Sequence, residues 1–260
     1  MSAVQTFWDH LDELRSVLIR IAVAVLLCSV ATFCFKDMLF AMVLAPQGAD
    51  FITYKVLDRL AGMFVSGAEP INAMSARLIN TGLAQQFLLH VKVSVWVGCM
   101  LASPYILYQL FGFVSPALYD SERKYALRLV VSGTVMFALG LMLSYFLVFP
   151  LTFRFLSTYQ VSIIVENTVT IDSYIDTLMS ISFSMGMIFE IPILCWVLGK
   201  MGIISPKLMR SYRRHVCVVL LVIGAIITPT SDVFTLLLVS LPMYMLYELS
   251  IHIVARTHKK

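Results

Sequence analysis

The stretch from Leu129 to Phe153, LVVSGTVMFALGLMLSYFLVFPLTF, contains no charged residue. It exceeds the roughly 20 apolar residues that a helix needs to cross the hydrocarbon core of a bilayer. A chain in lipid must satisfy its backbone hydrogen bonds internally, and this stretch lacks the alternating pattern of a membrane β-strand. The stretch therefore predicts a transmembrane α-helix in a protein that is embedded in a membrane.

The rest of the sequence repeats this pattern. Of the 260 residues, 60% are hydrophobic and 13% are charged, whereas a soluble domain is about half apolar and a quarter charged. We therefore predict an all-α integral membrane protein that forms a single domain over residues 1–260 and has six transmembrane helices. The predicted spans cover approximately residues 17–36, 87–110, 127–149, 176–198, 215–228 and 233–249.

The last two predicted spans are short, and the polar turn Thr228–Asp232 joins them. They are predicted to form a helical hairpin that is too short for an average bilayer. Outside the spans, Phe51–Met63 has the apolar spacing of an amphipathic helix, and Arg154–Asp176 forms another extramembrane connection. Before the first span, apolar residues at positions 7, 11, 14 and 18 predict a helix that lies on the membrane surface.

Lysine and arginine are distributed unequally between the two sides of the predicted spans. Of the 19 in the chain, six flank one side, and the other thirteen flank the opposite side. An excess of these residues marks the cytoplasmic side of a membrane protein. Six spans then place both termini in the cytoplasm. The thirteen are Arg15, Arg20, Arg123, Lys124, Arg128, Lys200, Lys207, Arg210, Arg213, Arg214, Arg256, Lys259 and Lys260.

Catalytic and metal-binding patterns are absent from the sequence. It contains no HExxH, GxSxG or GxxxxGK[ST] motif. Its five cysteines lie inside apolar runs and form no CxxC pair, so we interpret them as small buried hydrophobic residues. The sequence therefore predicts neither an enzyme nor a protein with a cofactor or a metal site.

A series of short motifs extends over nearly the whole chain. In order, the motifs are His10–Arg15 (HLDELR), Ala45-Pro46, Ser103–Gln109 (SPYILYQ), Phe113–Tyr119 (FVSPALY) with Glu122-Arg123, Phe149–Leu151 (FPL), Phe189–Pro192 (FEIP), and Thr228-Pro229 with Asp232–Phe234. Taken in this order, they resemble the motifs of TatC, the multi-span core subunit of the twin-arginine, or Sec-independent, protein translocase.

This resemblance implies a function in protein transport. It implies that the chain binds twin-arginine signal peptides of folded cargo proteins at the cytoplasmic face of the inner membrane. It further implies export of that cargo with the proton-motive force, small single-span partners of the TatA and TatB type, and self-association in a larger complex. No nucleic-acid partner and no cofactor are implied.

Two carboxylates, Glu13 and Glu122, are predicted to lie at the cytoplasmic face. Arginine pairs with a carboxylate through two charge-assisted hydrogen bonds, a geometry that lysine reproduces poorly. From the residues alone, weak surface ion pairs with neighbouring arginines are the simpler explanation. The resemblance instead implies signal-peptide recognition by both carboxylates, together with Arg15, Phe113, Pro116, Leu118, Tyr119 and Arg123. Phe113 is explained equally well as an ordinary interfacial aromatic residue.

Glu190 is the only ionisable residue well inside its apolar run. A charge at the centre of a bilayer costs about 2.5–3.5 kcal/mol on insertion scales, so the side chain should face other helices or a water-filled cavity. One interpretation is a neutral carboxylic acid that is hydrogen-bonded to a neighbouring helix, for instance to a carbonyl freed by Pro192. The other is a polar contact for the span of a partner, or a group that senses the energised membrane.

Two further function classes deserve comparison with a transport receptor. An ion-coupled solute transporter would depend on Glu190, but the sequence shows neither repeated halves nor paired broken helices. An intramembrane enzyme would need a nucleophile with a base, or a set of metal ligands, and neither is present.

Four further motif residues are interpreted as structural, and the three prolines among them as sites of kinks and turns. These residues are Pro46, Pro104, Pro192 and Asp232.

Overall fold

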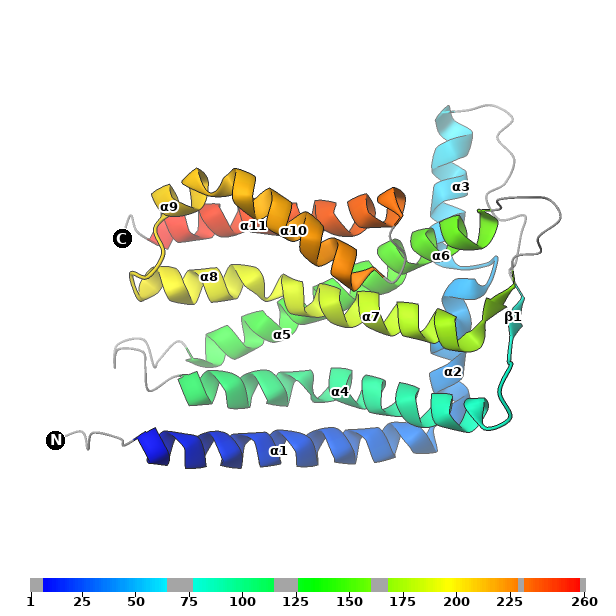
Figure 1. Cartoon of the computed structure of the whole chain (residues 1–260), viewed down its shortest axis with the longest axis horizontal. Helices are drawn as coiled ribbons and strands as arrows, with labels where there is room; N and C mark the ends of the chain where they lie inside the picture. Colours follow the sequence, from blue (N-terminus) through cyan, green and yellow to red (C-terminus); the bar gives the residue numbers. More distant parts are fainter. Residues whose placement is uncertain (1–6, 65–76, 115–125, 160–167, 229–231, 258–260) are drawn as a thin grey trace. The chain divides into compact units, whose positions relative to one another are not determined.

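A computed structural model describes residues 7–64, 77–114, 126–159, 168–228 and 232–257 (Figure 1). Most of the described chain is helical, as the sequence predicts. The helices are α1 (Phe7–Cys34), α2 (Lys36–Leu44), α3 (Ile52–Phe64), α4 (Gln85–Val114), α5 (Ala126–Leu143), α6 (Phe149–Thr158), α7 (Ile171–Phe189), α8 (Ile191–Lys200), α9 (Pro206–Ser211), α10 (Arg213–Ile227) and α11 (Val233–Thr257), with a 3-10 turn η1 (Ala45–Gln47) and a π-helical turn η4 (Ser144–Val148). Two short strands, β1 (Leu78–Ile79) and β2 (Val169–Thr170), form a parallel pair.

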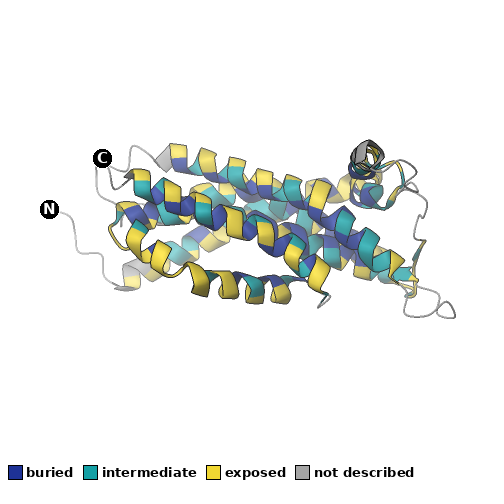
Figure 2. Cartoon of the chain, turned by 90° about the horizontal axis from the view of Figure 1, so that it is seen from above, coloured by how far each residue is buried: buried dark blue, intermediate teal, exposed yellow. Residues whose placement is uncertain are grey.

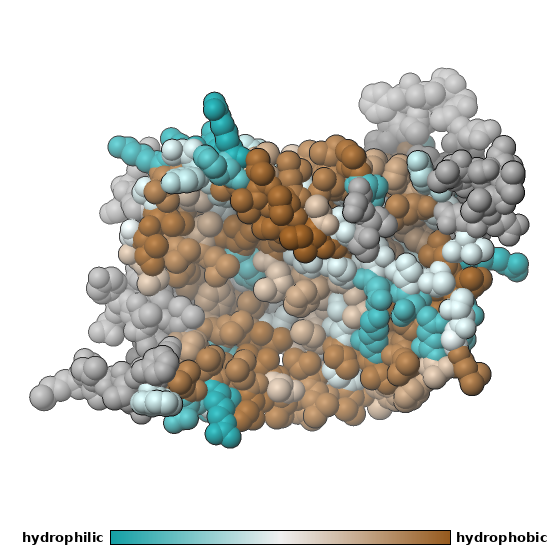
Figure 3. All heavy atoms as spheres, in the orientation of Figure 1, coloured by the Kyte–Doolittle hydropathy of each residue, from teal (hydrophilic) through white to brown (hydrophobic). Residues whose placement is uncertain are grey.

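Five segments of the described chain are long and apolar enough to cross a membrane. They are Leu11–Cys34, Gln85–Phe113, Arg128–Thr158, Ile171–Lys200 and Val233–Arg256. Large apolar side chains are exposed on these segments, and Figure 3 shows hydrophobic residues over much of the visible surface. Such extended apolar surface is typical of contact with lipid rather than with water. The chain is therefore a multi-pass membrane protein.

The predicted fifth span corresponds to α10, which has 15 residues. At 1.5 Å per residue, it extends about 22 Å, less than the roughly 30 Å of a bilayer core. The prediction that this element is short is confirmed. That α10 crosses the membrane stays a prediction, and so does the count of six spans.

The prediction that the last span is also short, ending near residue 249, was wrong. Helix α11 has 25 residues and continues to Thr257. The polar residues after Leu246 do not end it, because their side chains find partners. Glu248 pairs with Arg213 at 2.7 Å, and the Ser250 hydroxyl donates to the carbonyl of Leu246 at 2.7 Å.

The third span does not end near residue 149, as the sequence analysis predicted. The candidate span continues to Thr158, with η4 between α5 and α6. Pro150 lies at the start of α6, where the absence of its N–H interrupts no regular helical ladder because a π-helical turn precedes it. Helix α1 is one uninterrupted helix from Phe7, and the first candidate span begins at Leu11. The prediction of a separate helix on the membrane surface before the first span was therefore wrong.

The chain divides into two compact units, one of residues 1–39 with 90–135 and one of residues 40–89 with 136–260. In each, the helices present buried and exposed stripes (Figure 2). In the first unit, α1 and α4 approach closely at Gly98, where an added Cβ would lie 2.6 Å from the backbone nitrogen of Ser29. One turn further along α1, the Thr32 hydroxyl donates to the carbonyl of Ser94 at 2.9 Å. Because residue numbers rise along α1 as they fall along α4, the two helices are antiparallel.

In the second unit, tyrosine hydroxyls satisfy the carbonyls at the end of α2. Tyr145 donates to the carbonyl of Met42 at 2.6 Å, and Tyr174 donates to the carbonyl of Val43 at 3.0 Å. The last four carbonyls of a helix find no N–H donor within the helix, so they need donors from elsewhere in the chain. These bonds fasten α2 to the third and fourth candidate spans.

Tyr54 makes the corresponding bonds from α3. Its buried hydroxyl lies 3.1 Å from the carbonyl oxygen of Pro46 and 3.1 Å from that of Pro150. Burial raises the pKa of Tyr54 to about 12, although the positive charge of Arg154 acts in the opposite direction. The phenol is therefore a neutral donor throughout the physiological pH range, and it joins η1 to the start of α6.

We expect Tyr54→Phe to lower the free energy of unfolding by about 1–3 kcal/mol, because two buried carbonyls lose their donor. The loss should depend on pH. A phenol whose pKa is higher in the folded state than its ordinary value of 10.0 stabilises the fold below pH 10 and loses that contribution as the pH rises towards 12. Thermal unfolding in detergent should therefore separate the two proteins at pH 7 and bring them together near pH 12. Tyr108→Phe, at an exposed tyrosine, is the control that should leave stability unchanged.

Candidate functional site

The described residues of the predicted signal-peptide site lie in the first unit. Glu13 and Arg15 belong to the first half of α1, and Phe113 belongs to the last turn of α4. Since α1 and α4 are antiparallel and meet at Ser29 and Gly98, the beginning of α1 and the end of α4 lie at the same end of the pair (Figure 1).

Counting along the helices places Glu13 more closely. Glu13 precedes Ser29 by 16 residues, and Val114 follows Gly98 by 16 residues. At 1.5 Å per residue, both lie roughly 24 Å from the close contact, along parallel directions. The tertiary structure therefore brings Glu13 level with the last turn of α4, which holds Phe113. The chain enters residues 115–125 from this level.

The exposure of these side chains suits a binding role. Glu13 and Phe113 are half-buried and Arg15 is exposed. No salt bridge connects Glu13 or Arg15 to any other residue within the described ranges, so the simpler explanation of Glu13, a surface pair with Arg15, is not observed. The other predicted residues of this site, Pro116, Leu118, Tyr119, Glu122 and Arg123, lie outside the residues that the structure describes.

Glu190 occupies a break between α7 and α8 in the second unit. Pro192 lacks an N–H group and its ring would clash with the carbonyl of the residue four positions earlier, Ile188, so a helix cannot continue unchanged through this point. The carbonyl of Ile188 accepts instead from the backbone N–H of Glu190. The predicted bond from the Glu190 carboxyl group to a carbonyl freed by Pro192 is therefore not the arrangement at Ile188.

The Glu190 side chain is buried, at 7% exposure, and its Oε1 atom has no hydrogen-bond partner among the described residues. Just before the break, α7 approaches α5 closely. A Cβ on Gly140 would lie 2.7 Å from the carbonyl oxygen of Met185, and one on Gly186 would lie 2.7 Å from the ring of Phe137. The break thus carries a buried acceptor that no described residue satisfies, next to a tightly packed pair of helices.

The structure describes all four residues that were predicted to be structural. Pro46 is buried in η1, and Pro192 lies in the first turn of α8. Pro104 lies inside α4, which continues past it to Val114. The carboxylate of Asp232 accepts a bond from the N–H of Thr235 at 2.6 Å, so it caps the first turn of α11.

Within the part of the chain that the structure describes, no group of three or more His, Cys, Asp or Glu side chains is arranged to hold a metal ion.

Sequence analysis identified Glu190 but not the hydrogen bonds that the hydroxyls of Tyr54, Tyr145 and Tyr174 donate to backbone carbonyls. No motif spacing marks the carbonyls that accept these bonds.

Comparison with known proteins gives consistent results. The model of the family "TatC: Sec-independent protein translocase protein (TatC)" matches residues 9–242. The chain is 33% identical to a Sec-independent protein translocase protein TatC from Blattabacterium sp. subsp. Periplaneta americana, over 98% of this chain and 96% of that protein. It is also 33% identical to the protein of the same name from Azotobacter chroococcum, over 95% and 88% of the two chains. A crystal structure of the twin arginine translocase receptor TatC superimposes with a TM-score of 0.75 at 32% identity, covering 96% of this chain and all of that one.

Proposed function

The chain belongs to the TatC family of Sec-independent protein translocase proteins, and from this premise we propose that it is the signal-peptide receptor of a twin-arginine translocase. It binds twin-arginine signal peptides at its cytoplasmic face in the inner membrane. It has no catalytic chemistry of its own, and it acts with small TatA- and TatB-type single-span subunits in a larger, self-associated complex. The proton-motive force drives export of the folded cargo.

One observation supports this proposal more than any other. The antiparallel packing of α1 against α4 brings Glu13 level with Phe113, at the point where the chain enters the segment that contains Glu122. Two adjacent guanidinium groups require two carboxylates, and Glu13 is the one that the structure describes. An ion-coupled solute transporter, the alternative, has no comparable support.

Photocrosslinking tests the function directly. A photoreactive residue in place of Phe113 should capture a twin-arginine signal peptide added to membranes that contain the protein. The same peptide with two lysines should be captured poorly, because lysine cannot form the bidentate pairs. A photoreactive residue in place of Leu83, an exposed residue in the connection before α4, is the control that should capture neither. Equal capture of both peptides at Phe113 would contradict the proposal.

We also propose that the protein has six spans in one membrane domain, with both termini in the cytoplasm. The basic residues support this orientation, and α10 is the span that needs a test because of its length.

Single cysteines should report the topology in a variant whose five native cysteines are replaced by alanine. In intact cells, an impermeant thiol reagent should label Ser66→Cys and Ser231→Cys. It should leave Ser121→Cys, Ser205→Cys and Thr257→Cys unlabelled. If α10 does not cross, Ser231→Cys will be protected and Thr257→Cys will react. Labelling of Ser205→Cys without labelling of Ser66→Cys would show that the orientation in the membrane is the reverse of the one proposed.

Glu190 is proposed as a contact for the span of a partner subunit. The support is its buried Oε1 atom, which accepts no hydrogen bond from the described chain.

A further inference from the structure

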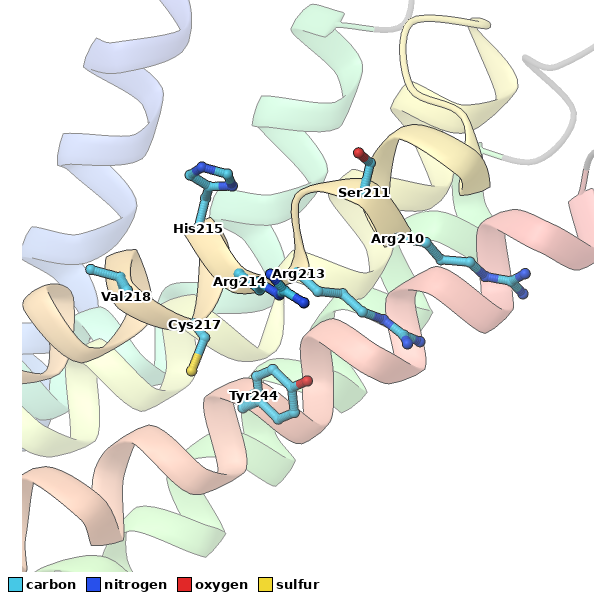
Figure 4. A pocket seen from close by; sticks show the side chains of 8 residues that line it. All are labelled: Arg210, Ser211, Arg213, Arg214, His215, Cys217, Val218 and Tyr244. Atoms are coloured by element: carbon cyan, nitrogen blue, oxygen red, sulfur yellow. The ribbon is translucent and has the colours of Figure 1, made fainter.

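An open cavity of about 800 Å³ lies where α9, the start of α10 and α11 meet, all within the second unit. Its lining is strongly basic. Arg210 comes from α9, and Arg213, Arg214 and His215 form the first turn of α10, while Tyr244 of α11 lies on the other side (Figure 4). None of the three described signal-peptide residues, Glu13, Arg15 and Phe113, lines this cavity.

The charges of the cavity are only partly compensated. Arg213 is paired with Glu248 at 2.7 Å, and the Tyr244 hydroxyl donates to the same carboxylate at 3.2 Å. Arg210 and Arg214 are exposed and form no salt bridge with a described residue. The Glu248 carboxylate therefore compensates Arg213, whereas the positive charges of Arg210 and Arg214 in the lining favour an anionic ligand.

The backbone N–H groups at the start of α10 are further hydrogen-bond donors for an anion. Helix α10 has 15 residues, and Tyr212, the residue before it, provides no side-chain cap. The first N–H groups of a helix have no partner within it, and the helix dipole places partial positive charge there. A phosphate group is the ligand that combines well with several N–H donors and guanidinium groups.

The surroundings identify the source of the phosphate. Directly after the basic turn, α10 exposes Val218, Val219 and Val222, and α11 exposes Leu241 and Met245. Figure 3 shows hydrophilic side chains over α9 and the start of α10, next to a hydrophobic surface that continues along α10. In a membrane protein, this boundary between charged and apolar surface lies at the level of the lipid headgroups. Tyr212 and His215, whose rings are 5.5 Å apart, add the aromatic character of that level.

We propose that this cavity binds an anionic phospholipid, with its phosphate at Arg210 and Arg214 and its acyl chains along the exposed face of α10. A free phosphate ion would use the same arginines but would gain nothing from the valines. A zwitterionic lipid would carry its own positive charge into a site that already has two. The site goes beyond the proposed receptor function, and its binding can be measured without signal peptide or partner subunits.

The test uses the purified full-length protein in a neutral detergent, with phosphatidylglycerol, phosphatidylcholine, glycerophosphoglycerol without acyl chains, and inorganic phosphate as probes. The dissociation constants can be measured by native mass spectrometry and by thermal stabilisation. Phosphatidylglycerol should bind more tightly than the other three. An arginine near the membrane contributes about a fivefold change in affinity for an anionic lipid, so Arg210→Gln with Arg214→Gln should weaken binding about 25-fold.

A matched control distinguishes binding at this cavity from non-specific electrostatic attraction between an anionic lipid and a basic protein. Lys200→Gln with Arg256→Gln removes the same charge from exposed residues of the same unit outside the cavity, and it should leave binding within about twofold. Arg210→Lys with Arg214→Lys keeps the charge and should lose less than the glutamine pair. All three double variants should have the parental melting temperature in the absence of lipid, because the substituted residues are exposed. Equal losses in the two glutamine pairs, or binding of inorganic phosphate as tight as that of the lipid, would overturn the proposal.

Discussion

Glu122→Ala is expected to abolish binding of a twin-arginine signal peptide while the protein still inserts and assembles. The peptide must bring two guanidinium groups out of water, and each needs a carboxylate partner. Truncating one partner of a desolvated charge pair costs about 2–5 kcal/mol, which is at least a thirtyfold loss of affinity. Glu122→Asp should be milder, since the carboxylate survives but is set back by one methylene group. Crosslinking of the signal peptide and export of a folded reporter measure both variants.

The matched control is Asp50→Ala. Asp50 is an exposed carboxylate, paired with Lys55 at 3.1 Å, and the predicted topology places it on the opposite side of the membrane. Its loss should leave signal binding and export at the parental level. If Glu122→Ala exports such substrates at the parental rate, the role assigned to Glu122 is wrong. If Asp50→Ala fails equally, loss of charge rather than loss of a specific contact explains both results.

Glu190→Leu and Glu190→Ala are expected to lose export, whereas Glu190→Gln should retain most of it. Glutamine has nearly the same shape and keeps a side-chain carbonyl in place of the unsatisfied Oε1 acceptor. A hydrogen bond between membrane helices contributes about 0.6 kcal/mol on average and up to about 1.7 kcal/mol. Loss of the acceptor should therefore weaken co-purification of a single-span partner by about 3- to 20-fold.

Stability separates a partner contact from an internal role. If the Glu190 carboxyl group serves only outside contacts, Glu190→Leu should melt in detergent at the parental temperature or above, because an unsatisfied buried acceptor has been removed. Failure of Glu190→Gln as complete as that of Glu190→Ala would show that ionisation, rather than hydrogen bonding, is required. Normal export by Glu190→Leu would remove both roles.

Local sequence properties were sufficient for much of the fold. The uncharged run Leu129–Phe153 lies within a candidate span, and the amphipathic spacing of Phe51–Met63 corresponds to α3. Hydrophobicity and helical period are properties of neighbouring residues, so they can be read without knowing what the segment packs against. The family was recognisable for a related reason, because its motifs are short and keep their order along the chain.

Element ends were harder to predict, because contacts distant in the sequence decide them. The last span was predicted to end near residue 249, but Arg213 on another helix pairs with Glu248, and α11 continues to Thr257. At Pro150, the preceding π-helical turn allows the helix to continue, although a proline inside a helix usually ends or bends it.

The sequence by itself determined that this is a helical membrane protein of the TatC type, because apolar run length and motif order are written along the chain. Only the tertiary structure decided which polar groups meet. It brings Glu13 level with Phe113 and the hydroxyl of Tyr174 to the carbonyl of Val43, 131 residues away. It also makes close contacts at single glycines such as Gly98, which no GxxxG pattern marks. Hydrogen bonds and close packing depend on where two helices cross, and that position is fixed by the whole set of contacts rather than by either helix alone.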